Sequence, residues 1–202
     1  VGTVMPDVEV KIGENNEILL RGKTITKGYY KKPEATAAAI DAEGWFHTGD
    51  AGYIKDGELY LTDRIKDLYK TSNGKYIAPQ AIENRLVIDR YIDQIALIGD
   101  QKKFVSALIV PVYSFVEAYA KEKNIQYSST EELLTNPRIV ALFKARIDTL
   151  QQEFAHYEQI KRFTLLANPF SMEKGELTNT LKIKRNVLLK NYAKEIDAMY
   201  EE

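Results

Sequence analysis

The stretch Gly44-Trp45-Phe46-His47-Thr48-Gly49-Asp50 decides how the first part of this chain folds. Gly49 allows the backbone to turn sharply after two aromatic residues, so the carboxylate of Asp50 is presented outward. A charged stretch, Asp63-Arg64-Ile65-Lys66-Asp67, follows it. Much later, Lys182 lies within Thr178-Asn179-Thr180-Leu181-Lys182-Ile183-Lys184-Arg185. The order of these three stretches is the most informative feature of the sequence.

The length and composition of the chain limit its fold and its partners. A chain of 202 residues can bury one large core or two small ones. The 28 basic and 29 acidic side chains give a formal net charge of −1, so nothing favours nucleic acid as a partner. No apolar run is as long as a membrane span, so we expect a soluble, cytoplasmic protein, with peripheral membrane association of a longer protein left open.

The chain contains no cysteine and two histidines, His47 and His156. Disulfides, thiolate metal ligands and a cysteine nucleophile are therefore excluded. The two histidines are far apart in sequence, so we expect no metal site, and His156 is expected late in a helix. The first residues, Val1-Gly2-Thr3-Val4, read as a strand without an initiating Met or a signal pattern, so we expect the chain to be cut from a longer protein.

Alternating apolar residues predict β-structure in the first third of the chain. The expected elements are strands at residues 8–12 and 18–20, a short helix at 33–40, and a hairpin of residues 53–54 with 58–61. Val8, Val10 and Ile12 alternate with charged residues, which is typical of a half-buried strand. Asp56-Gly57 predicts the hairpin turn, because Gly accepts the positive φ that such a turn requires.

The pattern becomes mixed after Asp63. The expected elements are a hairpin of residues 68–71 with 76–77, a short helix from Pro79 with Ile82, Leu86 and Arg90 on one face, strands at 95–98, 105–110 and 163–166, a helix from Asn136-Pro137, and a last helix at 186–199. Asn136 can cap a helix that Pro137 begins. Behind it, apolar residues recur every three or four positions as far as Tyr157. This stripe favours packing on the chain's own sheet over a coiled coil.

In this order and with these neighbours, the three stretches resemble the AMP-forming acyl-CoA synthetases. This family of adenylating enzymes includes fatty-acid ligases and firefly luciferase. The resemblance covers nearly the whole chain and implies the C-terminal part of a long-chain fatty acyl-CoA synthetase. The implied fold is α+β: residues 1–62 form a small β subdomain from the end of a large N-terminal adenylation domain, 63–67 a hinge, and 68–202 an α+β lid.

The resemblance implies that Asp50 and Arg64 bind ATP. A carboxylate accepts hydrogen bonds from both vicinal hydroxyls of a ribose, and a guanidinium donates to ribose oxygens and to phosphate. From the residues alone, Asp50 could equally be a turn or capping residue, and an Asp-Arg pair is usually a surface ion pair of little energetic weight. The order of the motifs favours the ribose interpretation.

By the same resemblance, Lys66 occupies the hinge position about which the lid rotates between two catalytic poses. Asp is common there and Lys is an accepted variant; as a bare sequence feature Lys66 is only an exposed lysine. Asn73-Gly74 reads as a tight turn, and the resemblance adds that Gly74 lets the pantetheine arm of CoA pass close to the backbone in the second pose. Glu83, expected in the first turn of the next helix, is interpreted as structural.

Lys182 is the candidate catalytic residue. Formation of an acyl-adenylate brings a carboxylate onto the α-phosphate of ATP, and an ammonium beside those oxygens stabilises the charge that builds up. Many family members have Ser-Gly before this lysine; Thr180-Leu181 stands here, which resembles the long-chain ligases of the eukaryotic type. On strand alternation Lys182 and Lys184 share a face, so spacing leaves both open as the reactive lysine. The basic residues of 180–194 read either as a surface for the phosphates of CoA or as a solvated face.

The resemblance therefore implies a ligase that uses ATP, Mg²⁺, a fatty acid and CoA, with these ligands bound mainly by an absent N-terminal domain. No phosphate-binding loop or acyl tunnel is recognised in these residues, so we expect the chain alone to be inactive. Two alternatives stay open. One is an adenylating ligase for another carboxylic acid or for a carrier-protein acceptor, and the other is an interaction module without a catalytic role. The long segment at 114–159 favours the long-chain type.

Overall fold

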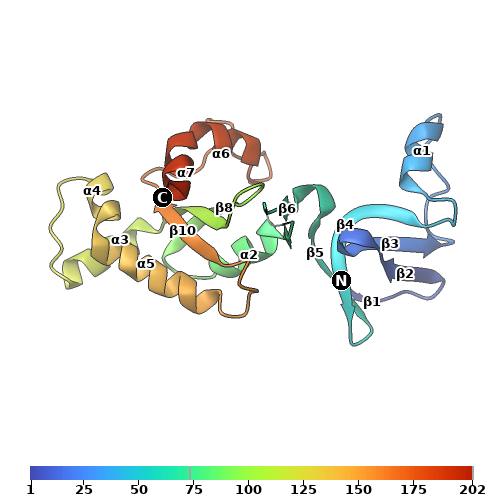
Figure 1. Ribbon diagram of the computed structural model, residues 1–202, viewed down its shortest axis with the longest axis horizontal. Helices are drawn as coiled ribbons and strands as arrows, with labels where there is room; N and C mark the ends of the chain where they lie inside the picture. Colours follow the sequence, from blue (N-terminus) through green and yellow to red (C-terminus); the bar gives the residue numbers. More distant parts are fainter. Residues whose placement is uncertain (73, 202) are drawn as a thin grey trace. The chain divides into compact units, whose positions relative to one another are not determined.

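The computed structural model describes residues 1–72 and 74–201, except for the side chain of Lys66. Within them the chain forms two compact units, Val1–Leu68 and Tyr69–Glu202 (Figure 1). Sheets and helices occur together, which confirms the α+β prediction. The predicted hinge at residues 63–67 and the domain bounds on either side of it stay predictions.

In residues 1–68, five strands form an antiparallel sheet in the order β1-β5-β4-β3-β2. The strands are β1 (Gly2–Thr3), β2 (Val8–Ile12), β3 (Glu17–Gly22), β4 (Phe46–Lys55) and β5 (Glu58–Arg64). A short 3₁₀ helix, η1 (Glu14–Asn16), joins β2 to β3, and α1 (Pro33–Ala39) precedes β4. The strands and the helix predicted for this part of the chain are therefore confirmed.

The predicted hairpin turn joins β4 to β5. Asp56 and Gly57 have φ of 52° and 79°, so both adopt the left-handed conformation of the turns that match the twist of a two-residue hairpin. Beside the turn, Tyr53 faces Tyr60 across the strands, and their rings stack with centroids 5.1 Å apart. The turn and this cross-strand pair both favour a single register of the two strands.

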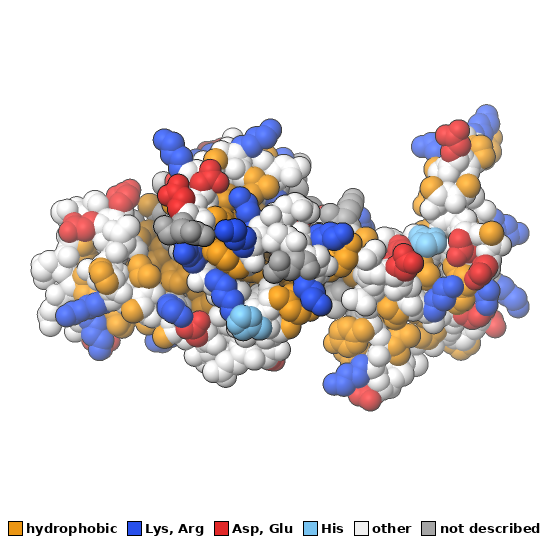
Figure 2. Space-filling model, in the orientation of Figure 1, with side chains coloured by type: hydrophobic (Ala, Val, Ile, Leu, Met, Phe, Trp, Pro, Cys, Tyr) orange, Lys and Arg blue, Asp and Glu red, His pale blue; other side chains and the backbone are white. Residues whose placement is uncertain are grey.

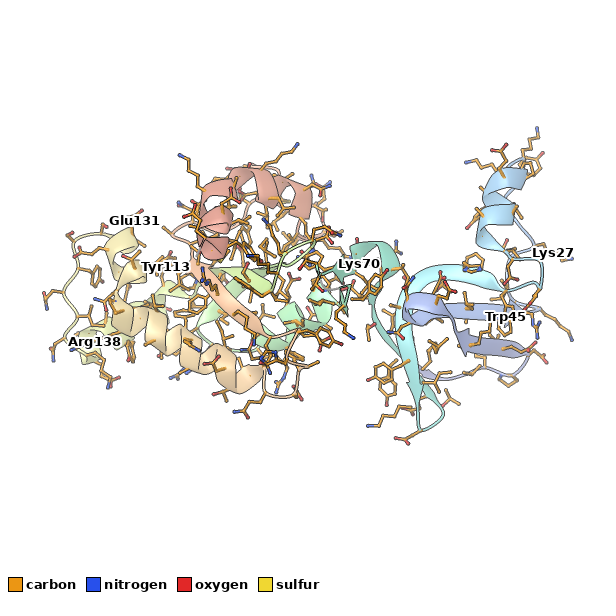
Figure 3. All side chains as sticks on the ribbon, viewed as in Figure 1. Lys27, Trp45, Lys70, Tyr113, Glu131 and Arg138 are labelled. Carbon is orange, nitrogen blue, oxygen red and sulfur yellow. The ribbon has the colours of Figure 1, made fainter. Side chains whose placement is uncertain are left out.

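Trp45 is a buried side chain of the first unit (Figure 3). Lys11 Nζ and Arg21 Cζ lie 4.3 Å and 4.4 Å from its ring centroid. Each such contact between a cation and an aromatic face contributes roughly 0.5–1 kcal/mol at an exposed site. Because Lys11 belongs to β2 and Arg21 to β3, Trp45 holds the start of β4 against both strands.

In residues 69–201, the central sheet has three strands in the order β10-β9-β8. β8 (Ile92–Ile98) is antiparallel to β9 (Val105–Pro111), and β10 (Ile160–Leu165) is parallel to β9. A separate small ladder pairs β6 (Tyr69–Lys70) with β7 (Tyr76–Ile77). The helices are α2 (Pro79–Leu86), α3 (Tyr113–Glu122), α4 (Thr130–Thr135), α5 (Pro137–Leu150), α6 (Arg185–Asn191) and α7 (Ala193–Tyr200).

Alternate residues of β8 enter two different hydrophobic cores. Ile95 and Leu97 belong to the first core cluster, and Ala96 and Ile98 to the second core cluster. The first core cluster also includes Leu86, Val116, Phe143 and Ile147, and the second also includes Leu166, Phe170, Leu188 and Met199. Helices thus cover both faces of the sheet (Figure 1). Burial on both faces explains why these strands read as continuous apolar runs.

The helix that was predicted from Asn136-Pro137 is confirmed at its start but ends early. The Asn136 side chain accepts a hydrogen bond from Arg138 N, as a helix cap does. α5 ends at Leu150, so the prediction that this helix continues to Tyr157 is wrong, and His156 lies in a turn. The reason is Gln151: its buried amide accepts a hydrogen bond from Ile160 N at 2.8 Å and directs the chain into β10.

Two other helix predictions also need correction. α2 ends at Leu86, so Arg90 lies outside it, because the chain turns before β8. The single helix predicted at residues 186–199 is two helices, α6 and α7, which are separated at Tyr192 with φ of −114° and ψ of 29°. The Tyr192 ring packs edge-on against Phe170 with centroids 5.9 Å apart, and this contact accompanies the break.

The surface of the chain carries charges of both signs. On the face drawn in Figure 2, basic and acidic side chains are interspersed. This distribution agrees with a formal net charge of −1. In residues 1–72 and 74–201, no helix combines the length and the apolar character that are required to span a bilayer.

Candidate functional site

Asp50 lies at an irregular point of β4. Across the β3/β4 ladder, Glu17 faces Ala51 and Leu19 faces His47, so residues 48–50 of β4 lie opposite a single residue of β3. Gly49 occupies this bulge with φ of 71°, a conformation that glycine adopts without strain. The sharp turn expected before Asp50 thus takes the form of a bulge inside a strand.

Glu17 holds this bulge in place. Its Oε1 accepts a hydrogen bond from Gly49 N at 3.0 Å, and its Oε2 lies 2.9 Å from His47 Nδ1. Thr48 Oγ1 donates to Ile18 O at 2.6 Å on the same strand pair. No sequence pattern marks Glu17, because its contacts exist only once β3 has paired with β4.

The structure brings Asp50 and Arg64 together. They face each other in the β4/β5 register, and Arg64 Nε lies 3.4 Å from Asp50 Oδ1. The Arg64 side chain is 61% exposed and that of Asp50 is 31% exposed. An ion pair this exposed contributes only about 0–1 kcal/mol to stability, so both groups can exchange partners with a ligand at little cost. Their donors and acceptors suit a diol and a phosphate.

The predicted hinge position lies in a single short turn. The 3₁₀ helix η2 (Ile65–Asp67) follows β5 directly, and Leu68 N donates to Arg64 O at 3.1 Å and to Ile65 O at 3.2 Å. The side chain of Lys66 lies outside the described residues. Backbone bonds of this local kind can re-form after a change of φ and ψ in neighbouring residues.

Gly74 lies in the turn between β6 and β7 with φ of 74°. Gly74 N donates to Thr71 O at 2.8 Å, and Thr71 N donates to Lys75 O at 2.9 Å. A Cβ at Gly74 would meet no atom of the described residues within 4 Å, so the backbone conformation, and not a lack of space, requires glycine here. Asn73, the other residue of the predicted turn, lies outside the described residues.

Lys182 closes a tight turn of residues 178–182. Thr178 N donates to Lys182 O at 2.8 Å, and Lys182 N donates back to Thr178 Oγ1 at 3.0 Å. Within the turn, Leu181 has φ of 59° and a side chain that is 66% exposed. An L-residue in this conformation is strained by roughly 1–2 kcal/mol. The Lys182 side chain is exposed at the end of this turn.

Lys182 and Lys184 are not alternate residues of a regular strand. Only an isolated bridge between Leu177 and Ile183 is present in the described residues of this stretch, and Ile183 packs against the second core cluster. Both lysines are exposed. They differ in backbone role, since Lys182 closes the turn whereas Lys184 is the N-cap residue of α6.

Arg185 is engaged with Glu83 in the interior of the second unit. Its Nη1 and Nη2 donate to Glu83 Oε1 and Oε2 at 2.7 Å and 2.8 Å. Burial by itself lowers the pKa of Arg185, but the hydrogen bonds and charge of Glu83 outweigh it and raise this pKa above its ordinary value. Arg185 is therefore not part of an exposed basic surface, whether for the phosphates of CoA or as a solvated face, the two interpretations that the sequence left open for residues 180–194. Glu83 lies in the second turn of α2, not the first, and its structural role comes from this pair.

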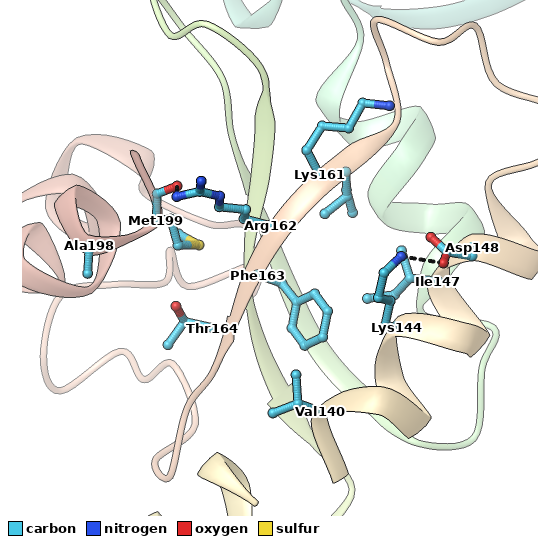
Figure 4. A pocket seen from close by; sticks show the side chains of 11 residues that line it. Val140, Lys144, Ile147, Asp148, Lys161, Arg162, Phe163, Thr164, Ala198 and Met199 are labelled. Carbon is cyan, nitrogen blue, oxygen red and sulfur yellow. Dashed lines mark hydrogen bonds and ion pairs between the residues drawn. The ribbon is translucent and has the colours of Figure 1, made fainter. Parts of the chain in front are cut away.

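A hollow of about 390 Å³ lies beside β10, between α5 and α7 (Figure 4). Val140, Ile147, Phe163 and Met199 are among its apolar lining residues. Its cations are engaged: Lys144 Nζ pairs with Asp148 at 2.6 Å, and Arg162 Nη1 donates to two backbone carbonyls at the end of α7. Of the candidate residues described in the second unit, neither Gly74 nor Lys182 lines it. Among the described residues, no group of three or more His, Asp or Glu side chains is arranged to hold a metal ion.

Comparison with known proteins assigns the chain to a family. Residues 66–202 match the model of the AMP-binding enzyme C-terminal domain. The chain is 34% identical to the long-chain-fatty-acid–CoA ligase FadD15 of Mycobacterium tuberculosis, covering 99% of this chain and 34% of that protein. It is 35% identical to the peroxisomal long chain acyl-CoA synthetase 7 of Arabidopsis thaliana, covering 100% of this chain and 31% of that protein. The chain thus spans about a third of the length of these relatives.

Solved structures of adenylating enzymes share its fold. The A-PCP didomain of carboxylic acid reductase from Segniliparus rugosus, solved with AMP, superimposes with a TM-score of 0.67 at 28% identity, covering 91% of this chain and 24% of that one. The adenylation domain of the carboxylate reductase from Mycobacterium chelonae gives a TM-score of 0.69 at 25% identity, covering 92% and 28%. With more than half of its length matched by the family model, the chain belongs to the AMP-binding enzyme C-terminal domain family.

Proposed function

We propose that this chain is the C-terminal part of an AMP-forming long-chain fatty acid–CoA ligase. In the first half-reaction the fatty-acid carboxylate attacks the α-phosphate of ATP, which forms an acyl-adenylate and releases pyrophosphate. In the second, the thiol of CoA attacks the acyl carbonyl, which forms the thioester and releases AMP. The family and the names of the relatives support this proposal, and they support a long-chain acid as the substrate.

The position of Lys182 carries the proposal. An exposed ammonium at the end of a closed turn can be presented to an anionic substrate. In adenylation, a carboxylate and a phosphate must approach each other while negative charge moves to the leaving pyrophosphate. A preorganised cation at these oxygens is worth about 10²–10³-fold in rate.

Asp50 and Arg64 hold the nucleotide in this proposal. Asp50 accepts hydrogen bonds from the two ribose hydroxyls, and Arg64 donates to a ribose oxygen or to the phosphate. Their direct pairing across β4 and β5 supports a shared ligand, because both polar groups reach the same point of the sheet. Glu17 keeps the bulge at Gly49, and therefore Asp50, in place.

The second half-reaction requires a second pose of the lid. In our proposal the backbone at residues 65–67, with Lys66 at its centre, changes conformation and brings the turn of Gly74 to the acceptor. The open space beside Gly74 suits the close passage of a pantetheine arm. The positive φ of Gly74 supports glycine as a requirement of the turn itself.

The remaining parts of the reaction belong to a larger N-terminal part. We propose that Mg²⁺, the triphosphate and the acyl chain are bound mainly there, since the relatives are about three times as long as this chain. When bound there, Mg²⁺ would neutralise part of the negative charge of the phosphates. This chain alone is then inactive. We place the whole protein in the cytoplasm, with peripheral association with membranes through its lipid substrates.

The test is to measure the two half-reactions separately in the longer enzyme that carries this chain. Lys182→Ala should lower acyl-adenylate formation by at least about 10²-fold. The same variant should form the thioester from a supplied acyl-adenylate at a rate close to that of the wild type. Lys184→Ala is the matched control, because Lys184 is also an exposed lysine and lies two positions away. If Lys184→Ala lost adenylation while Lys182→Ala kept it, the assignment of the catalytic lysine would be wrong.

A further inference from the structure

We infer that Arg185 is a positioning residue for Lys182: by clamping onto buried Glu83, it fixes the turn that carries Lys182 to the body of the second unit. This inference rests on the proposed function of Lys182 and adds a residue that touches no substrate. It has two parts, a structural tie between Arg185 and the turn, and a consequence of that tie for adenylation alone.

The clamp is rigid because Glu83 is held from several sides. Glu83 lies on α2, and its Oε1 also accepts a hydrogen bond from Leu97 N of β8 at 2.7 Å. The side chains of Arg185 and Glu83 are only 19% and 9% exposed. A planar guanidinium that meets a carboxylate with two parallel bonds has one favoured orientation. The backbone at Arg185 is therefore fixed relative to both α2 and β8.

Little slack separates Arg185 from the turn. Ile183 forms the bridge with Leu177 and packs against the second core cluster. Lys184 N donates to Glu176 O at 2.7 Å. Glu176 is itself buried, and its carboxylate accepts hydrogen bonds from Ser171 N and from the Asn191 side chain, each at 3.0 Å. Because these contacts leave Ile183 and Lys184 little freedom to change conformation, they cannot absorb a displacement of Arg185. The displacement therefore reaches Lys182.

The clamp also includes the residue at which the second unit begins. Tyr69 OH donates to Leu97 O at 2.6 Å, and the Arg185 guanidinium lies 5.3 Å from the Tyr69 ring centroid. Arg185 Nη1 reaches the same Leu97 carbonyl at 3.4 Å. Tyr69 is buried and follows Leu68 directly in the chain. When the backbone rotates about residues 65–67, Lys182 therefore moves with Tyr69 as part of one body.

Stability alone does not account for this ion pair. Replacing a buried ion pair by apolar residues of similar size is often neutral or stabilising, because the desolvation of both charges is avoided. What apolar packing cannot supply is the direction of a two-pronged charged bond. The direction of this bond matters because only two residues separate Arg185 from Lys182, so the orientation of Arg185 affects the turn that carries Lys182.

The chain offers a matched control in Arg146. Arg146 Nε lies 2.8 Å from both carboxylate oxygens of Asp89, with Asp89 only 7% exposed. Like Arg185, it lies over a tyrosine, with its guanidinium 4.5 Å from the Tyr91 ring centroid. It belongs to α5 and is distant in sequence from the turn of Lys182. Loss of this pair should therefore affect stability without moving Lys182.

The structural tie is tested in the 202-residue chain by amide hydrogen exchange. Arg185→Lys keeps the positive charge but loses the paired hydrogen bonds of the guanidinium to Glu83. It should speed exchange of the Leu181 and Lys182 amides by about tenfold, the effect expected from loss of a charged hydrogen bond. Arg146→Lys should leave both amides at the wild-type rate. Unchanged exchange in Arg185→Lys, or equal acceleration in both variants, overturns the inference. If Arg185→Lys does not fold, Glu83→Gln with Arg185→Gln removes both charges and supplies the same comparison.

The consequence for adenylation is tested in the longer enzyme. Arg185→Lys should lower kcat for acyl-adenylate formation by about tenfold with little change in KM for ATP, because the lysine is misplaced while the nucleotide contacts are untouched. Thioester formation from supplied acyl-adenylate should be unchanged, whereas a merely destabilised protein would lose both half-reactions. Lys182→Ala is measured in parallel. If it abolishes adenylation while Arg185→Lys does not lower it, the positioning role is wrong and the proposed function stands. If Lys182→Ala keeps adenylation, the catalytic lysine is wrong and the positioning role falls with it.

Discussion

Asp50 and Arg64 are direct neighbours across β4 and β5, with Arg64 Nε 3.4 Å from Asp50 Oδ1. In sequence they are separated by the rest of β4, the hairpin turn and most of β5. The left-handed turn at Asp56 and Gly57 reverses the chain so that the two residues meet. The bulge at Gly49 then sets the course of the strand before Asp50. Two groups suited to a ribose and a phosphate thus converge through ordinary hairpin geometry.

Asp50→Ala should weaken ATP binding to the longer enzyme by about ten- to a hundredfold, because a carboxylate that accepts two hydroxyl bonds is lost. The measurement is the Kd for ATP and for 2′-deoxy-ATP in both proteins. The deoxynucleotide should lose less, since one of the two hydroxyls is already absent. Glu58→Ala removes an exposed carboxylate from the same hairpin and should change neither Kd. Equal losses for both nucleotides in Asp50→Ala would make Asp50 a structural turn residue.

Lys66→Pro should disable one half-reaction much more than the other. Proline restricts φ to about −65° and restricts the preceding residue as well, so a hinge in η2 would be held in one of its two settings. We expect thioester formation to be lost and adenylation to be kept, as measured in separate assays of the longer enzyme. An equal loss in both would indicate misfolding, and full activity in both would remove residue 66 from the hinge.

Leu181→Gly should stabilise the 202-residue chain by about 1 kcal/mol. Leu181 has φ of 59° and is largely exposed, so glycine relieves backbone strain and sacrifices little burial. The free energy of unfolding in urea measures the effect. Leu189→Gly is the matched control, because Leu189 is also exposed but lies inside α6, where glycine should cost about 1 kcal/mol. A destabilised Leu181→Gly would contradict the left-handed turn.

The stability of the chain should fall as the pH rises from 10 to 12. Burial raises the pKa of Tyr113 and of Tyr192 to about 12, from an ordinary value near 10. In this window the unfolded chain has released protons that the folded chain retains, so the unfolded state binds fewer protons and stability decreases with pH. Below pH 10 both states are protonated and this contribution is fully present. Urea unfolding at a series of pH values measures the slope.

Tyr113→Phe should make this alkaline fall shallower, because one of the titrating groups is removed. It should also lower stability at pH 9, since Tyr113 OH donates to Leu166 O at 2.8 Å. Tyr30→Phe, at a side chain that is 85% exposed, should leave the slope unchanged. A slope in Tyr113→Phe that equals the wild-type slope would contradict the assignment.

Much of the fold could be predicted from local patterns. The alternation in β2, the Asp56-Gly57 turn and the start of α5 at Asn136-Pro137 each depend on residues that are close together in the chain. For the same reason the ends of elements were predicted poorly. Gln151 ends α5 by binding Ile160, and Tyr192 breaks the last helix while packing on Phe170. Neither contact has a local sequence signal.

The candidate site divides in the same way. The sequence by itself identified the candidate side chains for ATP binding and catalysis, Asp50, Arg64 and Lys182, because the motifs and their order point to them. Only the tertiary structure decided what holds those side chains: Glu17 at the bulge, and Glu83 with Arg185 behind the lysine turn. These partners come from different strands and helices. Their contacts form only when packing brings the elements together, so no spacing along the chain can encode them.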